Sequence, residues 1–357
     1  MSKIDDLTKQ TGEWLRGEGP MSEVVISSRI RLARNLKAYP FLSRADESQH
    51  RRIYRELSDS IANSPLGDDI FFADFETLSE LDRQVLVERH LVSRQHAEGE
   101  GTRGVAVSPN ERRALMVNEE DHLRIQVLRS GLQLDALWDE IREIDTGIEK
   151  QLEYAYHERY GYLTACPTNV GTGLRVSVML HLPALKLVKE IDRVFRAAQD
   201  MKLAVRGIYG EGTEAVGDFY QVSNQITLGR TEEEIIEEFG KTIIPKMVEY
   251  ELKVRDAMAK ERTYQLDDKV WRAYGTMNNA RAMSSDEALF LLSHLRMGVA
   301  MGRFKDLDVH TINRLLLQTQ PAHLQKIHHE TLTGEQRSIT RAEFVRARLR
   351  EYQARNN

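Results

Sequence analysis

The sequence contains a single cysteine, Cys166, among its 357 residues. One cysteine cannot form a disulfide within the chain, and it excludes a cysteine-rich structural zinc site. The scarcity of cysteine also indicates a reducing compartment. The first 30 residues hold no apolar segment of the signal-peptide type, and no run of about 18 apolar residues occurs anywhere. We therefore expect a cytoplasmic protein that is neither exported nor inserted in a membrane.

The sequence also lacks an excess of positive charge. It has 50 basic and 55 acidic residues and a net charge of −5, so no overall field favours nucleic acid as a direct partner. Neither G-x-x-x-x-G-K-[ST] nor G-x-G-x-x-G occurs, which excludes the common phosphate-binding loops. If the protein binds a nucleotide, arginine side chains must hold its phosphates.

The order of expected strands and helices predicts two domains. Strands alternate with helices up to about residue 255, and helices alone follow. This pattern predicts a mixed domain of strands and helices over 1–255 and a helical domain over 256–357. The expected strands are 24–31, 102–109, 113–117, 160–165, 174–180, 203–208 and 219–228. The expected helices before residue 255 are 46–63, 77–95, most of 126–163, 183–201 and one that begins after Thr231.

The lone cysteine lies in an unusual loop, Cys166-Pro167-Thr168-Asn169-Val170-Gly171-Thr172-Gly173. The proline and the two glycines force an irregular backbone and bring amide groups close to any ligand. A free cysteine is usually a small buried hydrophobe. Beside cationic groups, however, its thiol becomes a thiolate.

Five arginines in four segments are candidates for binding phosphate. Arg29 and Arg31 are two residues apart and share one face of an expected strand. Arg124, Arg175 and Arg206 lie on or beside other expected strands. Any one of them could be a solvated strand position. Together they could surround a triphosphate, because each guanidinium donates paired, charge-assisted hydrogen bonds.

The acidic run Glu119-Glu120-Asp121 precedes one of these arginines. Such a cluster is commonly a solvated turn. A functional interpretation is that Glu120 faces a cationic nucleophile, with Glu211 opposite and the Cys166 thiolate as a third negative contact. A guanidinium, whose pKa exceeds about 12, must lose a proton before it can attack. Two carboxylates would orient it and accept that proton.

The segments Ser27-Ser28-Arg29-Ile30-Arg31, Asn118-Glu119-Glu120-Asp121-His122-Leu123-Arg124 and Cys166-Pro167-Thr168-Asn169-Val170-Gly171-Thr172 occur in this order, with Arg175 and Arg206-Gly207 after them. Over residues 22–250 the chain resembles the phosphagen (guanidino) kinases. The resemblance implies an α+β fold in which helices flank an antiparallel sheet. It also implies ATP with Mg²⁺ and catalytic residues Glu120, Cys166 and Glu211, with no metal held by protein ligands alone.

The same resemblance implies that the five arginines bind the ATP phosphates and that His90 lies beside the adenine. The residues that it assigns to ATP are Ser27, Ser28, Arg29, Ile30, Arg31, His90, Arg124, Arg175, Val176, Ser177, Val178, Met179, Arg206, Gly207, Ile208, Tyr209 and Gly210.

The chain differs from the small-guanidine kinases in two features, and in both it resembles the bacterial protein arginine kinases of the McsB type. Only 26 residues precede Ser27, where small-guanidine kinases carry a helical domain that helps to enclose the substrate, and helices are added at the C-terminal end. This resemblance implies ATP-dependent phosphorylation of exposed arginines on proteins, which marks them for Clp-type proteolysis, and action on a heat-shock repressor. It also implies a homodimer or larger assembly and a zinc-containing activator protein.

The helical domain contains Arg337-Ser338-Ile339-Thr340-Arg341-Ala342. It is similar to the family motif Arg-Asp-x-x-Arg-Ala, which implies a regulatory phosphoarginine site that uses Arg337, Ser338 and Arg341. A basic helix face packed on its neighbours is the plainer interpretation. Because the neutral Ser338 replaces the acidic residue, we expect phosphoarginine binding to be weakened, altered or lost.

Two alternatives remain at this point. The first is a kinase of free arginine or another small guanidine, against which the missing front domain argues. The second is a phosphoarginine-binding adaptor with an inactive kinase domain. Retention of the five arginines, both glutamates and Cys166 argues against the adaptor, as does the altered motif at Arg337–Ala342.

Overall fold

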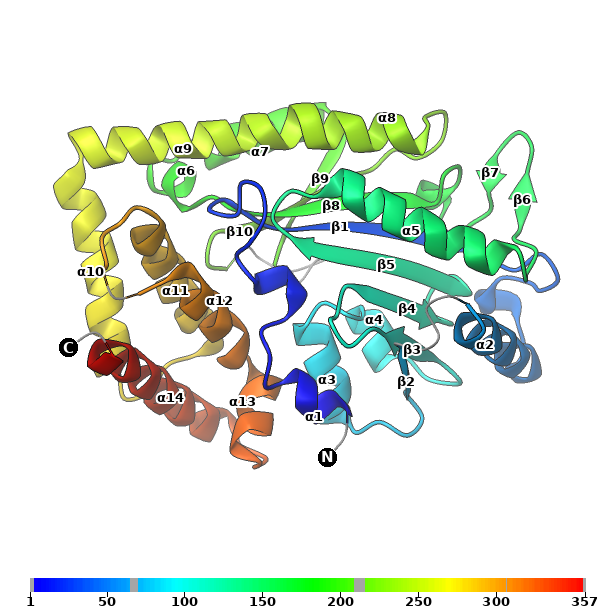
Figure 1. Ribbon diagram of the computed structural model, residues 1–357, viewed down its shortest axis with the longest axis horizontal. Helices are drawn as coiled ribbons and strands as arrows, with labels where there is room; N and C mark the ends of the chain where they lie inside the picture. Colours follow the sequence, from blue (N-terminus) through cyan, green and yellow to red (C-terminus); the bar gives the residue numbers. More distant parts are fainter. Residues whose placement is uncertain (1–2, 65–69, 209–215, 306, 356–357) are drawn as a thin grey trace.

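The computed structural model describes residues 3–64, 70–208, 216–305 and 307–355. Within these residues, eight strands form one antiparallel sheet in the order β2-β3-β4-β5-β1-β8-β10-β9, as the resemblance predicted (Figure 1). The strands are β1 (Val25–Arg34), β2 (Phe71–Asp74), β3 (Gly104–Val107), β4 (Arg113–Val117), β5 (Leu123–Ser130), β8 (Leu174–His181), β9 (Leu203–Gly207) and β10 (Phe219–Asn224). A separate hairpin pairs β6 (Tyr156–His157) with β7 (Gly161–Tyr162).

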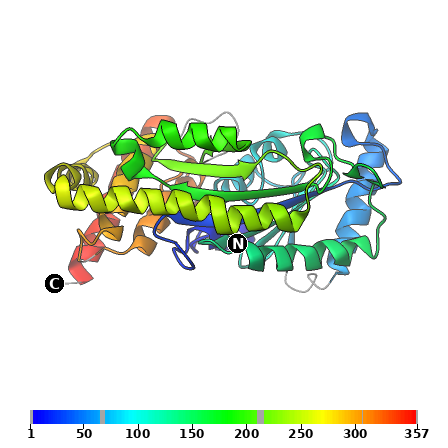
Figure 2. The same cartoon turned by 90° about the horizontal axis from the view of Figure 1, so that it is seen from above.

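One face of the sheet is apolar and is covered by long helices (Figure 2). Ile30 and Leu32 of β1, Val127 of β5 and Val176 of β8 are buried on this face. Burial of alternate side chains against helices stabilises the sheet, because each removes apolar surface from water. The covering helices are α2 (Glu47–Ala62), α5 (Leu134–Glu149), α7 (Ile191–Asp200), α8 (Glu232–Glu237) and α9 (Ile244–Glu261).

The opposite face has two apolar zones with a polar strip between them. Under β2, β3 and β4, residues such as Val105 and Met116 pack on α3 (Glu80–Glu88) and α4 (Arg94–Glu98). At the other end of the sheet, Leu128 and Met179 pack in a cluster with the C-terminal helices. The residues of β1, β5, β8, β9 and β10 between these zones are largely charged or polar, and this strip positions the candidate site.

The described residues of the C-terminal part form helices with connecting turns and no strand, as predicted. Its helices are α10 (Thr263–Asn279), α11 (Ser285–Ala300), α12 (Val309–Gln318), α13 (Pro321–His328) and α14 (Gly334–Arg355). The expected boundary at residue 255 falls inside α9, which follows α8 through a π-helical segment, η5 (Glu238–Ile243), and leads from the sheet to α10 (Figure 1). Among the described residues, no helix is both long and apolar enough to cross a membrane.

The N-terminal residues run between the sheet and the C-terminal helices (Figure 1). They form α1 (Lys3–Leu7), which packs near α3, and a short 3-10 turn, η1 (Glu13–Leu15), which contacts β5, β1 and α12. Trp14 and Leu15 are buried in the same apolar cluster as the C-terminal helices. Two further short elements are η2 (Leu42–Arg44) and η4 (Pro167–Asn169), the latter within the cysteine loop.

Several sequence-based element predictions were wrong. The segment 126–163 is not largely helical, because its start belongs to β5 and only α5 follows before the β6–β7 hairpin. The expected helix 77–95 divides into α3 and α4 at His90, whose φ is +59°. Likewise, 183–201 divides into α6 (Pro183–Leu187) and α7 at Lys189, whose φ is +63°. The short edge strand β2 was not predicted, and the strand expected over 160–165 is reduced to β7.

A buried ion pair joins the end of β1 to a helix and to the cysteine loop. Arg34 Nη2 lies 2.7 Å from Asp145 Oδ2 on α5, and Arg34 Nη1 donates to the carbonyl oxygens of Ala33 and Thr172 at 3.0 Å each. The guanidinium carbon lies 3.6 Å from the centre of the Tyr162 ring. One side chain therefore holds three segments that meet beside the polar strip.

We predict that Asp145→Ala lowers the free energy of unfolding by about 3–5 kcal/mol, because it leaves the Arg34 charge buried without a carboxylate. Urea denaturation would measure the loss. Asp268→Ala removes the exposed pair with Arg272 and is the matched control, with an expected change within about 0.5 kcal/mol. Equal losses in the two variants would contradict the role given to Arg34.

Candidate active site

The polar strip forms one wall of a cavity of about 320 Å³. Five arginines from four strands, two carboxylates, a histidine and the cysteine all reach this cavity. These lining residues are Arg29, Arg31, Arg124, Arg175, Arg206, Glu119, Glu120, His90 and Cys166. Residues far apart in the sequence therefore meet in one place, as the sequence analysis expected.

Strand register explains why the arginines share this face. Arg31 of β1 lies directly opposite Arg175 of β8, and Arg29 lies opposite Ser177. Arg124 of β5 lies opposite Ala33 of β1. Opposed residues in an antiparallel pair point to the same side of the sheet, so alternation along β1 places its arginines with those of its neighbours.

The same alternation turns other predicted ATP-binding side chains away from the cavity. Ile30, Val176 and Val178 are buried in the apolar core on the opposite face. Ser28 Oγ donates to the carbonyl oxygen of Gly131 at 2.6 Å and is also buried. These four side chains therefore do not line the cavity. They stabilise the strands that carry the arginines.

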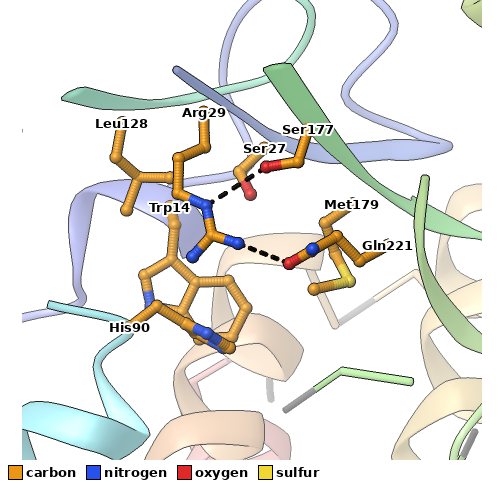
Figure 3. A pocket seen from close by; sticks show the side chains of 8 residues that line it. All are labelled: Trp14, Ser27, Arg29, His90, Leu128, Ser177, Met179 and Gln221. Atoms are coloured by element: carbon orange, nitrogen blue, oxygen red, sulfur yellow. Dashed lines mark hydrogen bonds between the residues drawn. The ribbon is translucent and has the colours of Figure 1, made fainter. Parts of the chain in front are cut away.

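Of the remaining predicted ATP-binding residues, Ile208 lines the cavity, and Gly207 ends β9 directly before it. Ser27, Ser177 and Met179 line a small pocket that continues the cavity beyond Arg29 (Figure 3). The predicted residues Tyr209, Gly210 and Glu211 lie outside the described residues.

The arginine cluster carries positive charge in a place where water is scarce. Burial, and then the charges of Arg29, Arg175 and Arg124, hold the pKa of Arg31 well below its usual range. Burial and Arg175 lower the pKa of Arg29 to about 10. The Nε of Arg31 is buried and has no hydrogen-bond partner among the described residues. This donor set fits a polyanion, which would neutralise the mutual repulsion and accept the spare donor.

The far end of the cavity is more apolar. Arg29 donates from Nε to Ser177 Oγ at 3.2 Å and from Nη2 to Gln221 Oε1 at 2.5 Å (Figure 3). Beside it, the ring of His90 meets Trp14 edge to face, with centroids 4.3 Å apart. Burial, with Arg29 and Arg94, lowers the pKa of His90 to about 3, so its ring is neutral at physiological pH. A neutral aromatic wall suits a nucleobase better than a phosphate.

The other end of the cavity is anionic. Glu119 is buried, and its carboxylate lies 2.6 Å from Arg124 Nη1. Ser93 Oγ donates to Glu119 at 2.6 Å, and the Glu120 amide donates to it at 2.7 Å. Although burial raises the pKa of Glu119, Arg124 and these two hydrogen bonds bring it below its usual range. Glu120 also pairs with Arg124, but 36% of its side chain is exposed, so it is open to a ligand from outside.

The third carboxylate of the acidic run has a structural role. Asp121 is fully buried, and its Oδ1 accepts from the Asn35 side chain at 2.8 Å and from the Ala165 amide at 2.7 Å. Asn35 also donates to the carbonyl oxygen of Leu163 at 3.1 Å. Asp121 therefore fixes the segment directly before Cys166 against the turn that carries Glu120.

The cysteine loop is braced from its other side as well. Thr227 Oγ1 donates to the carbonyl oxygens of Thr168 and Val170, at 2.9 and 2.7 Å. At Gly171 φ is +113°, and a Cβ would lie 2.7 Å from the Thr227 carbonyl oxygen, so this position requires glycine. The Sγ of Cys166 lies 3.0 Å from Thr168 Oγ1, and Cys166 is half-buried at the cavity wall.

Comparison with known proteins agrees with this geometry. A family model described as the C-terminal catalytic domain of ATP:guanido phosphotransferases matches residues 53–254. A second, described as the C-terminal domain of protein-arginine kinase McsB, matches residues 263–357. The protein-arginine kinase of Halothermothrix orenii is 44% identical over 98% of this chain and 99% of its own length. That of Desulforamulus reducens is 43% identical over 98% of each chain.

The chain belongs to the protein-arginine kinase family. It is therefore an enzyme of the guanidino phosphotransferase class. Among solved structures, a duplicated taurocyamine kinase from Schistosoma mansoni is similar with a TM-score of 0.60 and 27% identity, over 65% of this chain and 33% of that one. A lombricine kinase shares the fold, with a TM-score of 0.59 at 23% identity over 71% of this chain and 76% of its own.

Sequence reasoning missed some residues that shape the site of this family member. Trp14 comes from the N-terminal segment, to which no function was assigned, and Gln221 comes from β10. Neither has a local sequence signal, because both reach the site only through tertiary packing. Glu119 was noticed within the acidic run, but its pairing with Arg124 could not be read from spacing alone.

The structure describes every residue of the motif Arg337–Ala342 in the helical part. Its two arginines have different contacts. Arg341 is buried and donates to the carbonyl oxygens of Thr319 at 2.6 Å and Met283 at 2.9 Å, so it ties α14 to the ends of neighbouring segments. Arg337 donates to the Leu332 carbonyl oxygen at 2.8 Å and lines a separate cavity of about 630 Å³ beside α3 and α13. Ser338 Oγ donates within its own helix to Gly334. Phosphoarginine binding at this motif stays a prediction.

We predict that Arg31→Met raises the melting temperature of the nucleotide-free protein by about 2 °C or more, because it removes a buried charge that its neighbours repel. The same variant should lose most of the further rise that saturating Mg·ATP gives the wild type. Differential scanning calorimetry would measure both. Arg142→Met, which removes an exposed arginine of α5, is the control and should leave both values unchanged. A less stable Arg31 variant would contradict this account of the cluster.

Proposed function

We propose that this enzyme transfers the γ-phosphoryl group of ATP to a guanidino nitrogen of arginine side chains on proteins. The observation that carries the proposal is the division of one cavity into a cationic part and an anionic end. A triphosphate fits the first and a guanidinium fits the second. The names of the relatives, all protein-arginine kinases, support the same acceptor.

The register of β1 orders the two ligands along the cavity. Successive residues on one face are about 7 Å apart. Ala33, opposite Arg124, marks the anionic end, Arg31 and Arg175 follow, and Arg29 leads toward His90 and Trp14. A nucleotide with its base near His90 would then point its terminal phosphate toward Glu120.

In the proposed reaction, the guanidino nitrogen attacks the γ-phosphorus in line with the leaving oxygen. A nitrogen–phosphorus bond forms, the bond between the γ-phosphorus and the bridging oxygen breaks, and ADP leaves. Glu120 orients the guanidinium and accepts the proton that the attacking nitrogen loses. The arginines neutralise charge on the phosphoryl oxygens. Cys166 lies at the cavity wall near this end, and Glu211 remains a second predicted carboxylate.

Mg²⁺ would accompany ATP and screen its phosphates, as in phosphoryl transfer generally. Among the described lining residues, Glu119 and Glu120 are the carboxylates, and oxygen ligands are those that Mg²⁺ prefers. The buried, unpartnered Nε of Arg31 and the mutual repulsion of the arginines fit the triphosphate itself.

An acceptor presented on a protein fits the exposed anionic end. The partly exposed Glu120 and the half-buried Cys166 can be approached from the surface, so an arginine side chain can enter while its backbone stays outside. The wider role rests on the family resemblance alone. It comprises marking for Clp-type proteolysis, action on a heat-shock repressor, a zinc-containing activator, a homodimer or larger assembly and a cytoplasmic location without direct nucleic-acid or membrane partners.

We predict that Glu120→Ala abolishes transfer while Mg·ATP still raises the melting temperature, because the arginine cluster stays intact. Casein incubated with enzyme and Mg·ATP at neutral pH, then examined by mass spectrometry, should gain acid-labile phosphate on arginine only with the wild type. Glu211→Ala should behave in the same way. Near-normal transfer by the Glu120 variant would contradict its role. Phosphate on free arginine but on no protein would replace the proposal by a small-guanidine kinase.

A further inference from the structure

An arginine of the enzyme is paired with the carboxylate to which the proposed reaction assigns the substrate. Arg124 Nη2 is paired with Glu120 Oε2, and Arg124 Nη1 lies 2.6 Å from Glu119 Oε2. A third, longer contact of 3.4 Å joins Arg124 Nη2 to Asp121. Arg124 is 14% exposed, so its guanidinium is held inside the cavity and not at its rim.

This pairing competes directly with a substrate. A carboxylate binds a substrate arginine most strongly when both of its oxygens accept hydrogen bonds from the planar guanidinium group. One of the two Glu120 oxygens is already taken by Arg124. Two guanidinium groups on one carboxylate would also repel each other in a partly buried site. Glu120 is therefore unable to grip a substrate fully while Arg124 stays where it is.

The carboxylates of the acidic turn stabilise this position of the Arg124 side chain. Burial alone would lower the pKa of Arg124, but Glu119, Asp121 and Glu120 raise it above its usual value. By contrast, Arg31 and Arg29 have lowered pKa values and no carboxylate contact among the described residues. Unlike Arg29 and Arg31, Arg124 therefore has its charge compensated by carboxylates, one of which is Glu120, the residue assigned to the substrate.

We propose that Arg124 keeps the guanidinium subsite closed until a nucleotide binds. A terminal phosphate near Arg31 and Arg175 offers Arg124 a stronger anionic partner, and the side chain turns from Glu120 to the phosphate. Glu120 is then free for the acceptor arginine. This inference rests on the proposed function and adds an order of binding to it. Nucleotide and acceptor bind with positive coupling, and by thermodynamic linkage each increases the affinity of the other by the same factor.

The test is the affinity of the wild-type enzyme for a fluorescein-labelled peptide that contains one arginine, measured by fluorescence anisotropy. We expect the dissociation constant to fall by about tenfold or more when Mg²⁺ and adenylyl imidodiphosphate, a non-hydrolysable ATP analogue, are added. Inorganic tripolyphosphate with Mg²⁺ should have a similar effect, because only the phosphates displace Arg124. The same peptide with lysine in place of arginine corrects for binding by charge alone. Equal affinity with and without nucleotide would overturn the inference.

Arg124→Met separates displacement from a general effect of charge. Without nucleotide, this variant should bind the arginine peptide about tenfold more tightly than the wild type, and nucleotide should add little. Arg29→Met is the matched control, because it removes a positive charge from the same cavity at a residue whose guanidinium bonds Ser177 and Gln221. Its nucleotide-free affinity for the peptide should stay close to that of the wild type. An equal gain in both variants would show that the loss of any positive charge from the cavity raises the affinity for the peptide. That result would overturn the inference.

Arg124→Met also leaves Glu119 buried without its cation, which could disturb folding. The double variant Glu119→Gln with Arg124→Met removes both charges, and it should show the same gain in nucleotide-free affinity. The wild-type coupling needs no variant at all. If the enzyme phosphorylates proteins but nucleotide does not change its affinity for the peptide, this inference fails and the proposed function stands. If the peptide neither binds nor gains phosphate under any condition, both fail.

Discussion

Mutual repulsion among buried guanidinium groups is the constraint on which the site depends. Strand register places Arg29, Arg31 and Arg175 on one face of the sheet, so the sheet itself fixes the backbone positions from which these side chains extend. The lowered pKa values of Arg29 and Arg31 reflect the free energy that is needed to bring these charges together. The apolar face of the sheet supplies that free energy, because its long helices bury an extended core. A site under this strain is prepared to bind a polyanion.

The acidic run beside this cluster illustrates how three adjacent carboxylates acquire different tasks. Glu119 is buried and holds Arg124, Glu120 reaches the cavity, and Asp121 anchors the segment before Cys166. Burial and partners, not residue type, separate them. Asp121 connects the acidic turn to the segment before the cysteine loop by a hydrogen bond from the Ala165 amide. Their relative position is therefore set by a hydrogen-bonded network that contains no reacting atom.

The sequence predicted that the five arginines gather in one place more successfully than it predicted the elements that carry them. The spacing of Arg29 and Arg31 was enough to place both on one face of a strand, since side chains alternate along it. The last residues of β5, from Gln126 to Ser130, were wrongly assigned to a helix, although Leu123, Ile125 and Val127 alternate with polar residues. The contribution of Trp14 was invisible, because an isolated aromatic residue gains its role only from what packs on it. Local periodicity is readable from sequence, whereas contacts between distant segments are not.

The helical part also fixes the end of the cavity where His90 lies. The Glu88 carboxylate accepts from the amides of Ala322 and His323 at the start of α13, at 2.7 and 3.0 Å. The next residue, Arg89, is fully buried and lies 3.0 Å from the His323 ring nitrogen. His90 follows directly, with the positive φ that turns it into the cavity. Hydrogen bonds to α13 thus fix the last turn of α3. The position of His90 therefore depends on how the helical part packs against the sheet. The shape of the cavity therefore depends on both parts of the chain.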